Sequence, residues 1–203
     1  MGREALEDRL IVMPLLDENQ IGEASLDLRL GSEFLLLRRT DDSGLDPAEQ
    51  AQSLVERMQT RVRVDMGDRL WLHPGQFVLG ATLEFLRLPP DLAAYVVGRS
   101  SWGRVGLIPA TAIFVQPGFA GCLTLELVNQ GESPIALYPG LRIAQLVVHE
   151  LPSATEHPYG RSTDQKYVGP TGPQVSHLSK EAHEIEGLRA LRRRVSGRAT
   201  PPE

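Results

Sequence analysis

The chain of 203 residues has a single cysteine and few aromatic side chains, and it lacks a long apolar run. Cys122 alone can form neither an internal disulfide nor a zinc site built from several cysteines. Without an apolar stretch of about 18 residues, or an apolar core in the N-terminal segment, neither a membrane span nor a signal peptide is expected. We therefore expect a soluble, cytoplasmic protein.

Positive charge is also scarce. Lysine and arginine number 21 against 26 acidic residues, which gives a formal net charge of -5. Bulk electrostatic attraction to nucleic acid is therefore not expected. Any anion that the chain binds must be held by a local cluster of cationic side chains, so the expected partner is a small molecule.

Short runs rich in valine, leucine and isoleucine are abundant. Residues 24–37, ASLDLRLGSEFLLL, alternate leucines with Asp27 and Arg29 as a half-buried strand does, and Gly31 ends this strand. Further along, turn signals separate apolar runs at intervals of roughly ten residues: His73-Pro74-Gly75, Pro89-Pro90, Pro117-Gly118 and Pro139-Gly140. This spacing predicts an all-β domain, either a barrel or a sandwich, with Trp71 in its core.

The pattern divides the chain into three parts. Residues 1–151 form the predicted β-domain, which opens with a short helix over residues 3–10. Residues 152–178 form a tail that cannot build a core, and residues 179–203 form a C-terminal helical extension with Ser179 as its N-cap. Inside the first part, residues 40–68 are polar and acidic, and they predict a helical turn or two within a long excursion.

The stretch VVGRSSWGRVGLI, residues 96–108, combines glycines, two serines and two arginines. Glycine lets the backbone approach a ligand closely, hydroxyls donate hydrogen bonds, and guanidinium groups bind phosphate oxygens. Arg99, Ser100, Ser101 and Arg104 could therefore form a polyphosphate site. The pattern also fits an ordinary turn with solvent-exposed arginines, and the stretch alone does not decide between the two.

Glu126 lies in a predicted strand in which Leu123, Leu125 and Leu127 share one face. Thr124, Glu126 and Val128 then share the other face. A lone glutamate on a strand most often faces solvent. In a cleft it could act as a general base, with a pKa adjusted by burial or by an arginine such as Arg104.

Five segments, in order, resemble the motifs of the deoxycytidine triphosphate deaminase family, within the trimeric deoxyuridine triphosphatase (dUTPase)-like superfamily. They are ASLDLRLGSEF, GRSSWGRVGL, TAIFVQPGFAGCLTLEL, YPGLRIAQL and HPYGRSTDQKYVGPTGPQVS. The resemblance implies a distorted jelly-roll β-barrel of the dUTPase-like type with short terminal helices. It also implies a homotrimer whose active sites lie between subunits.

The resemblance further implies roles for single residues. Glu126 would be the general base, and Arg104, Ser100 and the carbonyl of Ala112 would complete the catalytic group. The residues implied in substrate binding are Arg99, Ser100, Ser101, Thr111, Gln116, Gln145, Tyr159 and Lys166. Asp27 would support the site or a hydrated magnesium ion, and the tail with Tyr159 and Lys166 would close over the ligand.

The implied reaction is the zinc-independent, hydrolytic deamination of dCTP to dUTP and ammonia. One cysteine cannot supply the Pro-Cys-x-x-Cys part of the zinc deaminase signature. Magnesium would instead arrive with the triphosphate and neutralise its charge.

Four positions depart from the family pattern. Gln116 stands where an aspartate commonly precedes Pro-Gly, and an amide cannot act as a general base, which argues against a triphosphatase step. The other departures are Pro109, Trp102 and Pro170. Two alternatives therefore remain: a bifunctional enzyme that continues to dUMP and diphosphate, and a nucleotide-binding family member without turnover.

Overall fold

The computed structural model describes residues 9–42, 44–48, 51–110, 113–161, 167 and 169–196. The chain divides into two compact units. The first comprises Met1–Leu36 and Arg61–Gln174, and the second comprises Leu37–Thr60 and Val175–Glu203. Each unit is described by itself.

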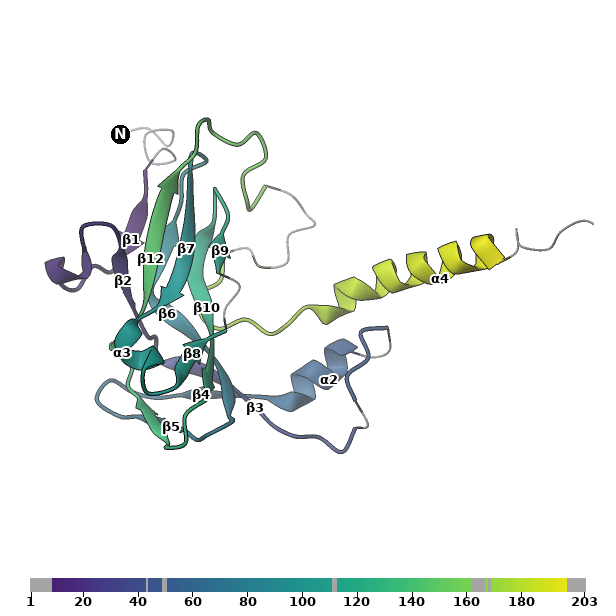
Figure 1. Ribbon diagram of the computed structural model, residues 1–203, viewed down its shortest axis with the longest axis horizontal. Coiled ribbons are helices and arrows are strands. Elements are labelled where there is room, and N and C mark those ends of the chain that lie inside the picture. Colours follow the sequence, from purple (N-terminus) through teal and green to yellow (C-terminus); the bar gives the residue numbers. More distant parts are fainter. Residues whose placement is uncertain are drawn as a thin grey trace, which may run out of the picture. The chain divides into compact units, whose positions relative to one another are not determined.

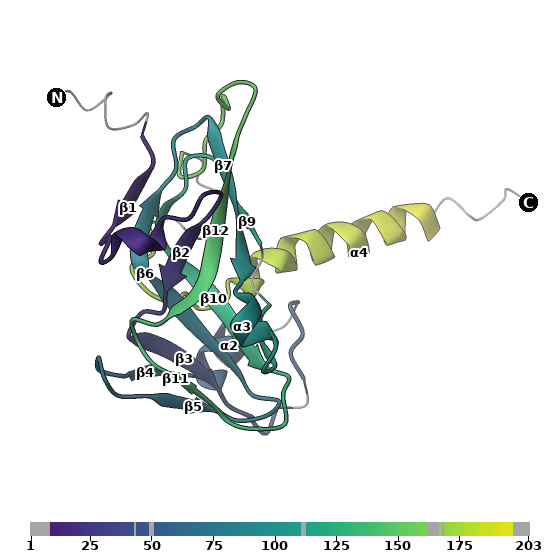
Figure 2. The same cartoon turned by 60° about the vertical axis from the view of Figure 1, so that its left-hand side comes forward.

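The first unit is built of β-strands, which confirms the predicted fold class (Figures 1 and 2). Its first strands are β1 (Ile11–Met13), β2 (Leu26–Arg29), β3 (Glu33–Leu37), β4 (Gln59–Arg63), β5 (Leu70–Leu72) and β6 (Phe77–Arg87). The others are β7 (Leu92–Gly98), β8 (Leu107–Pro109), β9 (Phe114–Val115), β10 (Ala120–Asn129), β11 (Ile135–Leu137) and β12 (Arg142–Glu150). Two short helical segments, η1 (Glu18–Gln20) and α3 (Ser100–Gly103), interrupt the strands.

The described strands form two main sheets. One has the order β4-β3-β6-β10-β8, with β1 also paired to β6, and the other has the order β2-β12-β7-β9. Strands β5 and β11 pair as a separate two-stranded ribbon. Because β12 lies between β2 and β7, it brings the sequence around residue 27 next to the end of β7, where α3 begins.

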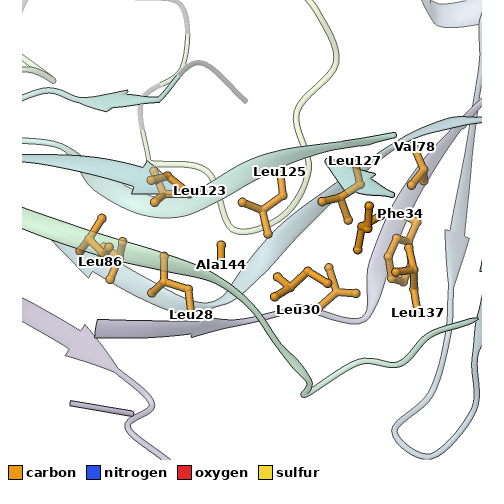
Figure 3. Close-up of a cluster of buried hydrophobic side chains, with 14 of the residues drawn as sticks. Leu28, Leu30, Phe34, Val78, Leu86, Leu123, Leu125, Leu127, Leu137 and Ala144 are labelled. Atoms are coloured by element: carbon orange, nitrogen blue, oxygen red, sulfur yellow. The ribbon is translucent and has the colours of Figure 1, made fainter. Parts of the chain in front are cut away.

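Strand β10 shows the predicted alternation. Leu123, Leu125 and Leu127 are buried, whereas Thr124 and Glu126 are only half-buried. Figure 3 shows these leucines of β10 lying across from residues of β2 and β12 in the buried cluster. The leucines thus fill the core between the sheets, and Glu126 is left on the opposite face of its strand.

A register shift between Cys122 and Thr124 interrupts the pairing of β10 with β6. The Thr82 hydroxyl accepts a hydrogen bond from Leu123 N at 2.9 Å, and the carbonyl of Pro170 accepts one from Cys122 N at 2.7 Å. A bulge of this kind re-aims the side chains that follow it. The shift lies directly before Thr124, and the pairing of β10 with β6 is regular again from there through Glu126.

The second unit contains α2 (Ala51–Met58), η2 (Leu178–Glu181) and α4 (Ala182–Ser196). Helix α2 confirms the helical turns predicted within the polar excursion. The terminal helix is also present, but Ser179 is not its N-cap, because Ser179 lies within the 3-10 turn η2 and α4 begins after it. The opening helix predicted over residues 3–10 falls almost entirely outside the described residues.

Trp71 is not in the core. It is 50% exposed on the outward face of β5, between the inward Leu70 and Leu72. The Arg69 guanidinium lies 5.3 Å from the centre of its ring, a cation–π contact that covers one ring face. Across the described residues, no helix is both long enough and apolar enough to cross a membrane.

Candidate active site

The proposed phosphate segment begins where β7 ends. Arg99 has extended backbone and precedes α3, a single turn in which Arg104 N donates to the carbonyl of Ser100 at 3.0 Å. Ser100, Ser101 and Arg104 are exposed, so their hydroxyl and guanidinium groups can meet a ligand from solvent. A β-carbon at Gly98 would lie 2.9 Å from Pro109, which shows how closely β8 packs against the start of this segment.

Asp27 contacts two of the predicted binding residues, Gln145 and Arg99. Its Oδ1 accepts a hydrogen bond from Gln145 Nε2 at 3.0 Å, because β2 and β12 place these two residues opposite each other. Its Oδ2 lies 3.6 Å from Arg99 Nη2 and 3.3 Å from Arg142 Nη1. Asp27 therefore fixes the direction of the Arg99 side chain.

An open pocket of about 620 Å³ lies beside this cluster. Its lining combines three arginines with one acid, one hydroxyl and apolar side chains: Arg29, Arg99, Arg142, Asp17, Ser101, Trp102, Val105 and Leu141. Three guanidinium groups against one lining carboxylate suit a ligand with several negative charges.

Asp17 and Arg142 form the shortest ion pair of the pocket. Arg142 Nη2 donates to Asp17 Oδ2 at 2.6 Å, and Arg29 Nη2 lies 3.9 Å from the same oxygen. The backbone N–H of Asn19 and, less strongly, the Arg142 guanidinium hold the pKa of Asp17 below its usual value. Asp17 therefore remains ionised and keeps both arginines oriented.

Sequence reasoning missed Arg29, Arg142 and Asp17. A signal for Arg29 was present, because the alternation in residues 24–37 places it on the same strand face as Asp27. The pairing of Asp17 with Arg142 joins residues 125 positions apart, and no local pattern predicts it.

Glu126 lies in the other sheet, on β10. Desolvation raises the pKa of its carboxyl above the usual value for glutamic acid. A raised pKa makes a carboxylate a stronger base, which favours a group that must first accept a proton and later return it. The backbone of the segment after β8 reaches this residue, since Ala110 N donates to the carbonyl of Glu126 at 2.7 Å.

The structure thus brings together Arg99, Ser101, Asp27 and Gln145, while Glu126 belongs to a different sheet. Arg104 is exposed at the end of α3, and burial rather than Arg104 shifts the pKa of Glu126. Three predicted site residues, Thr111, Ala112 and Lys166, lie outside the described residues.

Tyr159 docks on the turn that carries Gln116. Tyr159 N donates to the carbonyl of Pro117 at 2.7 Å, and its ring centre lies 6.0 Å from that of Phe119. Gln116 itself is exposed, and its carbonyl accepts a hydrogen bond from Phe119 N at 3.1 Å. The Gln116 side chain is therefore available to a ligand.

The chain is similar to known proteins along most of its length. A family model described as dCTP deaminase-like matches residues 2–151. The chain belongs to this family.

Individual relatives agree with the family model. The chain is 47% identical over 174 residues to a dCTP deaminase of Natronomonas pharaonis, covering 85% of this chain and 88% of the relative. It is 40% identical over 183 residues to a protein of Methanosphaera stadtmanae named "dCTP deaminase, dUMP-forming", covering 89% of this chain and 92% of the relative. Proteins of both descriptions are therefore similar to this chain along most of its length.

A solved structure shares the fold. The crystal structure of 2'-deoxycytidine 5'-triphosphate deaminase from Agrobacterium tumefaciens matches with a TM-score of 0.54 and 27% sequence identity. The match covers 68% of this chain and 41% of that chain. The resemblance to the deoxycytidine triphosphate deaminase family, and the β-fold that it implied, are thus confirmed.

Two departures from the family motifs take up structural roles here. Trp102 is packed against the core, and its Nε1 donates to the carbonyl of Arg142 at 2.9 Å, which ties α3 to β12. Pro170 is buried, and its carbonyl receives the hydrogen bond from Cys122 N at the β10 bulge. Both side chains therefore hold elements around the site in place.

The charges that line the pocket favour an anion over a bare metal ion. No group of three or more His, Cys, Asp or Glu side chains able to hold a metal ion occurs among the described residues. Asp27 directs both carboxylate oxygens at protein donors, so it could reach a hydrated ion only through water. The surrounding arginines match the anionic oxygens of a triphosphate, and magnesium bound to that triphosphate would neutralise part of its charge.

Proposed function

We propose that this chain is a hydrolase that converts dCTP and water to dUTP and ammonia in the cytoplasm. The observation that carries the proposal is Glu126, a half-buried carboxyl with a raised pKa in a chain of the dCTP deaminase-like family. Relatives named for this activity, at 47% identity, support it.

In the proposed mechanism Glu126 removes a proton from a water molecule while the water oxygen bonds to C4 of cytosine. The same carboxyl then gives that proton to the exocyclic nitrogen, the C4–N bond breaks, and ammonia leaves. The second hydrogen of the water ends on N3 as the C4 carbonyl of uracil forms. Ser100, Arg104 and the carbonyl of Ala112 orient the water and the amino group, and no zinc takes part.

The triphosphate binds at the arginine pocket. Arg99 and the hydroxyls of Ser100 and Ser101 hold phosphate oxygens, with magnesium carried by the ligand. Gln145 lies near the nucleotide, and Gln116 and Thr111 face its sugar and base. The support for this placement is the pocket itself, which joins Arg99 and Ser101 to two further arginines.

The tail closes the site in this proposal. Residues 152–178 carry Tyr159 and Lys166, which fold over the triphosphate and exclude bulk water from the cleft. The docking of Tyr159 on Pro117, beside Gln116, supports a position near the sugar.

The assembly that we propose is a homotrimer with sites between subunits. The family resemblance supports this assembly, in which one subunit supplies Glu126 and a neighbour supplies Arg104 and Ser100.

A bifunctional enzyme that forms dUMP is the second candidate, and the similarity to dUMP-forming relatives favours it. Incubating the purified chain with dCTP and magnesium and separating the products distinguishes the candidates. We expect dUTP and ammonia to accumulate in equal amounts, because Gln116 cannot activate water for attack on phosphorus. Accumulation of dUMP and diphosphate would favour the second candidate, and tight dCTP binding without ammonia would favour a non-catalytic binding protein.

A further inference from the structure

A buried acid lies behind the arginine pocket. Glu84, on β6, has no exposed surface, and both of its carboxylate oxygens accept hydrogen bonds. Gln20 Nε2 donates to Oε1 at 2.9 Å, and the backbone Arg29 N donates to Oε2 at 2.9 Å. A buried carboxylate is costly unless it is paired and hydrogen-bonded, so these contacts are needed for the fold.

The side chain of Gln20 connects the Glu84 carboxylate to Arg29. The side chain is 1% exposed, and its Nε2 donates to Glu84 and to the carbonyl of Asp27, the latter at 3.1 Å. Its Oε1 accepts hydrogen bonds from Arg29 Nε at 2.9 Å and from Leu16 N at 3.2 Å. An amide has one donor end and one acceptor end, so an acceptor at Glu84 obliges the Gln20 oxygen to face Arg29.

The Arg29 guanidinium, which lines the pocket, is held in place by these contacts. Its Nε is held by Gln20 and its Nη1 by the carbonyl of Gly140 at 2.7 Å. Its Nη2 faces Asp17 at 3.9 Å, and Asp17 in turn holds Arg142 at 2.6 Å. The chain of contacts therefore runs from the interior of the sheet to two of the three pocket arginines.

We propose that Glu84 and Gln20 are positioning residues that hold Arg29 and Arg142 in the orientation in which the pocket receives a polyphosphate. The proposal rests on the assignment of that pocket to the triphosphate under the proposed function. Glu84 is not among the pocket-lining residues and acts through Gln20 and Arg29. Removing its negative charge changes the pocket without deleting any group that touches the ligand.

The substitution Glu84→Gln tests this chain of contacts. The new amide would keep its oxygen for the backbone Arg29 N and present its donor end to Gln20, which then either faces it donor against donor or turns its own amide to accept it. A turned Gln20 amide would put its oxygen against the carbonyl of Asp27 and its Nε2 against Arg29 Nε, so the guanidinium would leave its present orientation. The paired substitution Gln20→Glu with Glu84→Gln restores an acceptor opposite both the new amide donor and Arg29 Nε, with the charge moved to position 20 and the donor to the Asp27 carbonyl lost.

Two measurements read out the effect. With dCTP as substrate, we expect Glu84→Gln to raise KM about tenfold with kcat within about twofold, the loss expected for one charge-assisted hydrogen bond. With inorganic tripolyphosphate as a probe, calorimetry should show a similar loss of affinity. The paired substitution should recover part of both losses, which a merely destabilised fold would not do.

Leu137→Ala is the matched control. Leu137 is fully buried in β11 and is not a member of the Glu84 network, so this substitution lowers stability and should leave KM and tripolyphosphate affinity unchanged. Unchanged tripolyphosphate affinity in Glu84→Gln, or no recovery in the paired variant, overturns the positioning role. No tripolyphosphate binding by the wild-type chain also overturns it, whatever the chain does to dCTP. Tripolyphosphate binding without deamination of dCTP would instead refute the proposed function alone.

Discussion

At the scale of single residues, the environment of a carboxyl decides what it can do. Asp17 and Glu126 are both acids at the surface of the β-unit, but hydrogen bonds lower the pKa of Asp17 and desolvation raises the pKa of Glu126. The first therefore suits a permanent anion that orients arginines, and the second suits a group that exchanges a proton.

The substitution Glu126→Gln should reduce kcat for dCTP deamination by at least about a hundredfold, because it removes the general base. It should leave the chain folded, since the amide has nearly the same shape as the carboxyl and avoids the desolvation that disfavours the carboxylate. Ammonia release and thermal unfolding measure the two effects. Glu132→Gln, at an exposed glutamate just beyond β10, is the control and should change neither quantity.

The pH dependence of stability follows from the same residue. A raised pKa in the folded state means that the folded chain holds this proton to higher pH than the unfolded chain does. The resulting stabilisation is present below the unfolded value near 4.5 and is lost as the pH rises through the folded pKa. Unfolding by urea across this range should show Glu126→Gln gaining on the wild type as pH rises. A constant difference between the two would contradict the raised pKa.

At the scale of elements, the turn after β9 holds the segment that follows β12. Gly118 has a φ of 83°, and a β-carbon there would lie 2.6 Å from Pro158 and 2.9 Å from Tyr159 N. The turn is therefore shaped to accept the backbone of the docked segment, which only a glycine allows.

The substitution Gly118→Ala should release this segment and lower kcat for dCTP, because Tyr159 can no longer dock on Pro117. Faster proteolytic cleavage near residue 159, together with steady-state kinetics, measures the release. Gly67→Ala is a matched control, since Gly67 has a φ of 93° but nothing within 4 Å of its β-carbon position. Both variants carry the left-handed strain of about 1 kcal/mol, and only the first blocks docking. Equal activity in the two variants would mean that the docked segment does not serve the reaction.

At the scale of the whole molecule, the proposed homotrimer makes a prediction about how the active site is assembled. If each active site takes Glu126 from one subunit and Arg104 from its neighbour, inactive variants should complement each other. Co-refolding equal amounts of Glu126→Gln and Arg104→Ala should restore deaminase activity to about a quarter of the wild-type value, since random mixing leaves about one site in four intact. Each variant refolded alone should stay inactive. If mixed oligomers recover no deaminase activity, Glu126 and Arg104 of each active site come from the same subunit.

Much of the fold could be predicted because it follows from local patterns. The period of two placed Leu123, Leu125 and Leu127 in the core and Glu126 on the opposite face, and Gly31 separates β2 from β3 as expected. The prediction that Trp71 lies in the core was wrong. Trp71 belongs to a short strand of a two-stranded ribbon, and its side chain lies on the outer face, where Arg69 covers it. The prediction of Ser179 as the N-cap of the terminal helix was wrong, because Ser179 lies in a 3-10 turn that comes before α4.

The sequence by itself determined the strand pattern, the family and the residue types at the candidate site, because all of these are written in short, ordered segments. Only the tertiary structure decided that Asp27 joins Gln145 and Arg99, that Asp17 holds Arg142, and that a buried Glu84 stands behind Arg29. The physical reason is strand register. Contacts between residues 55 to 125 positions apart depend on which strands pair and where a bulge shifts them, and no local pattern contains that information.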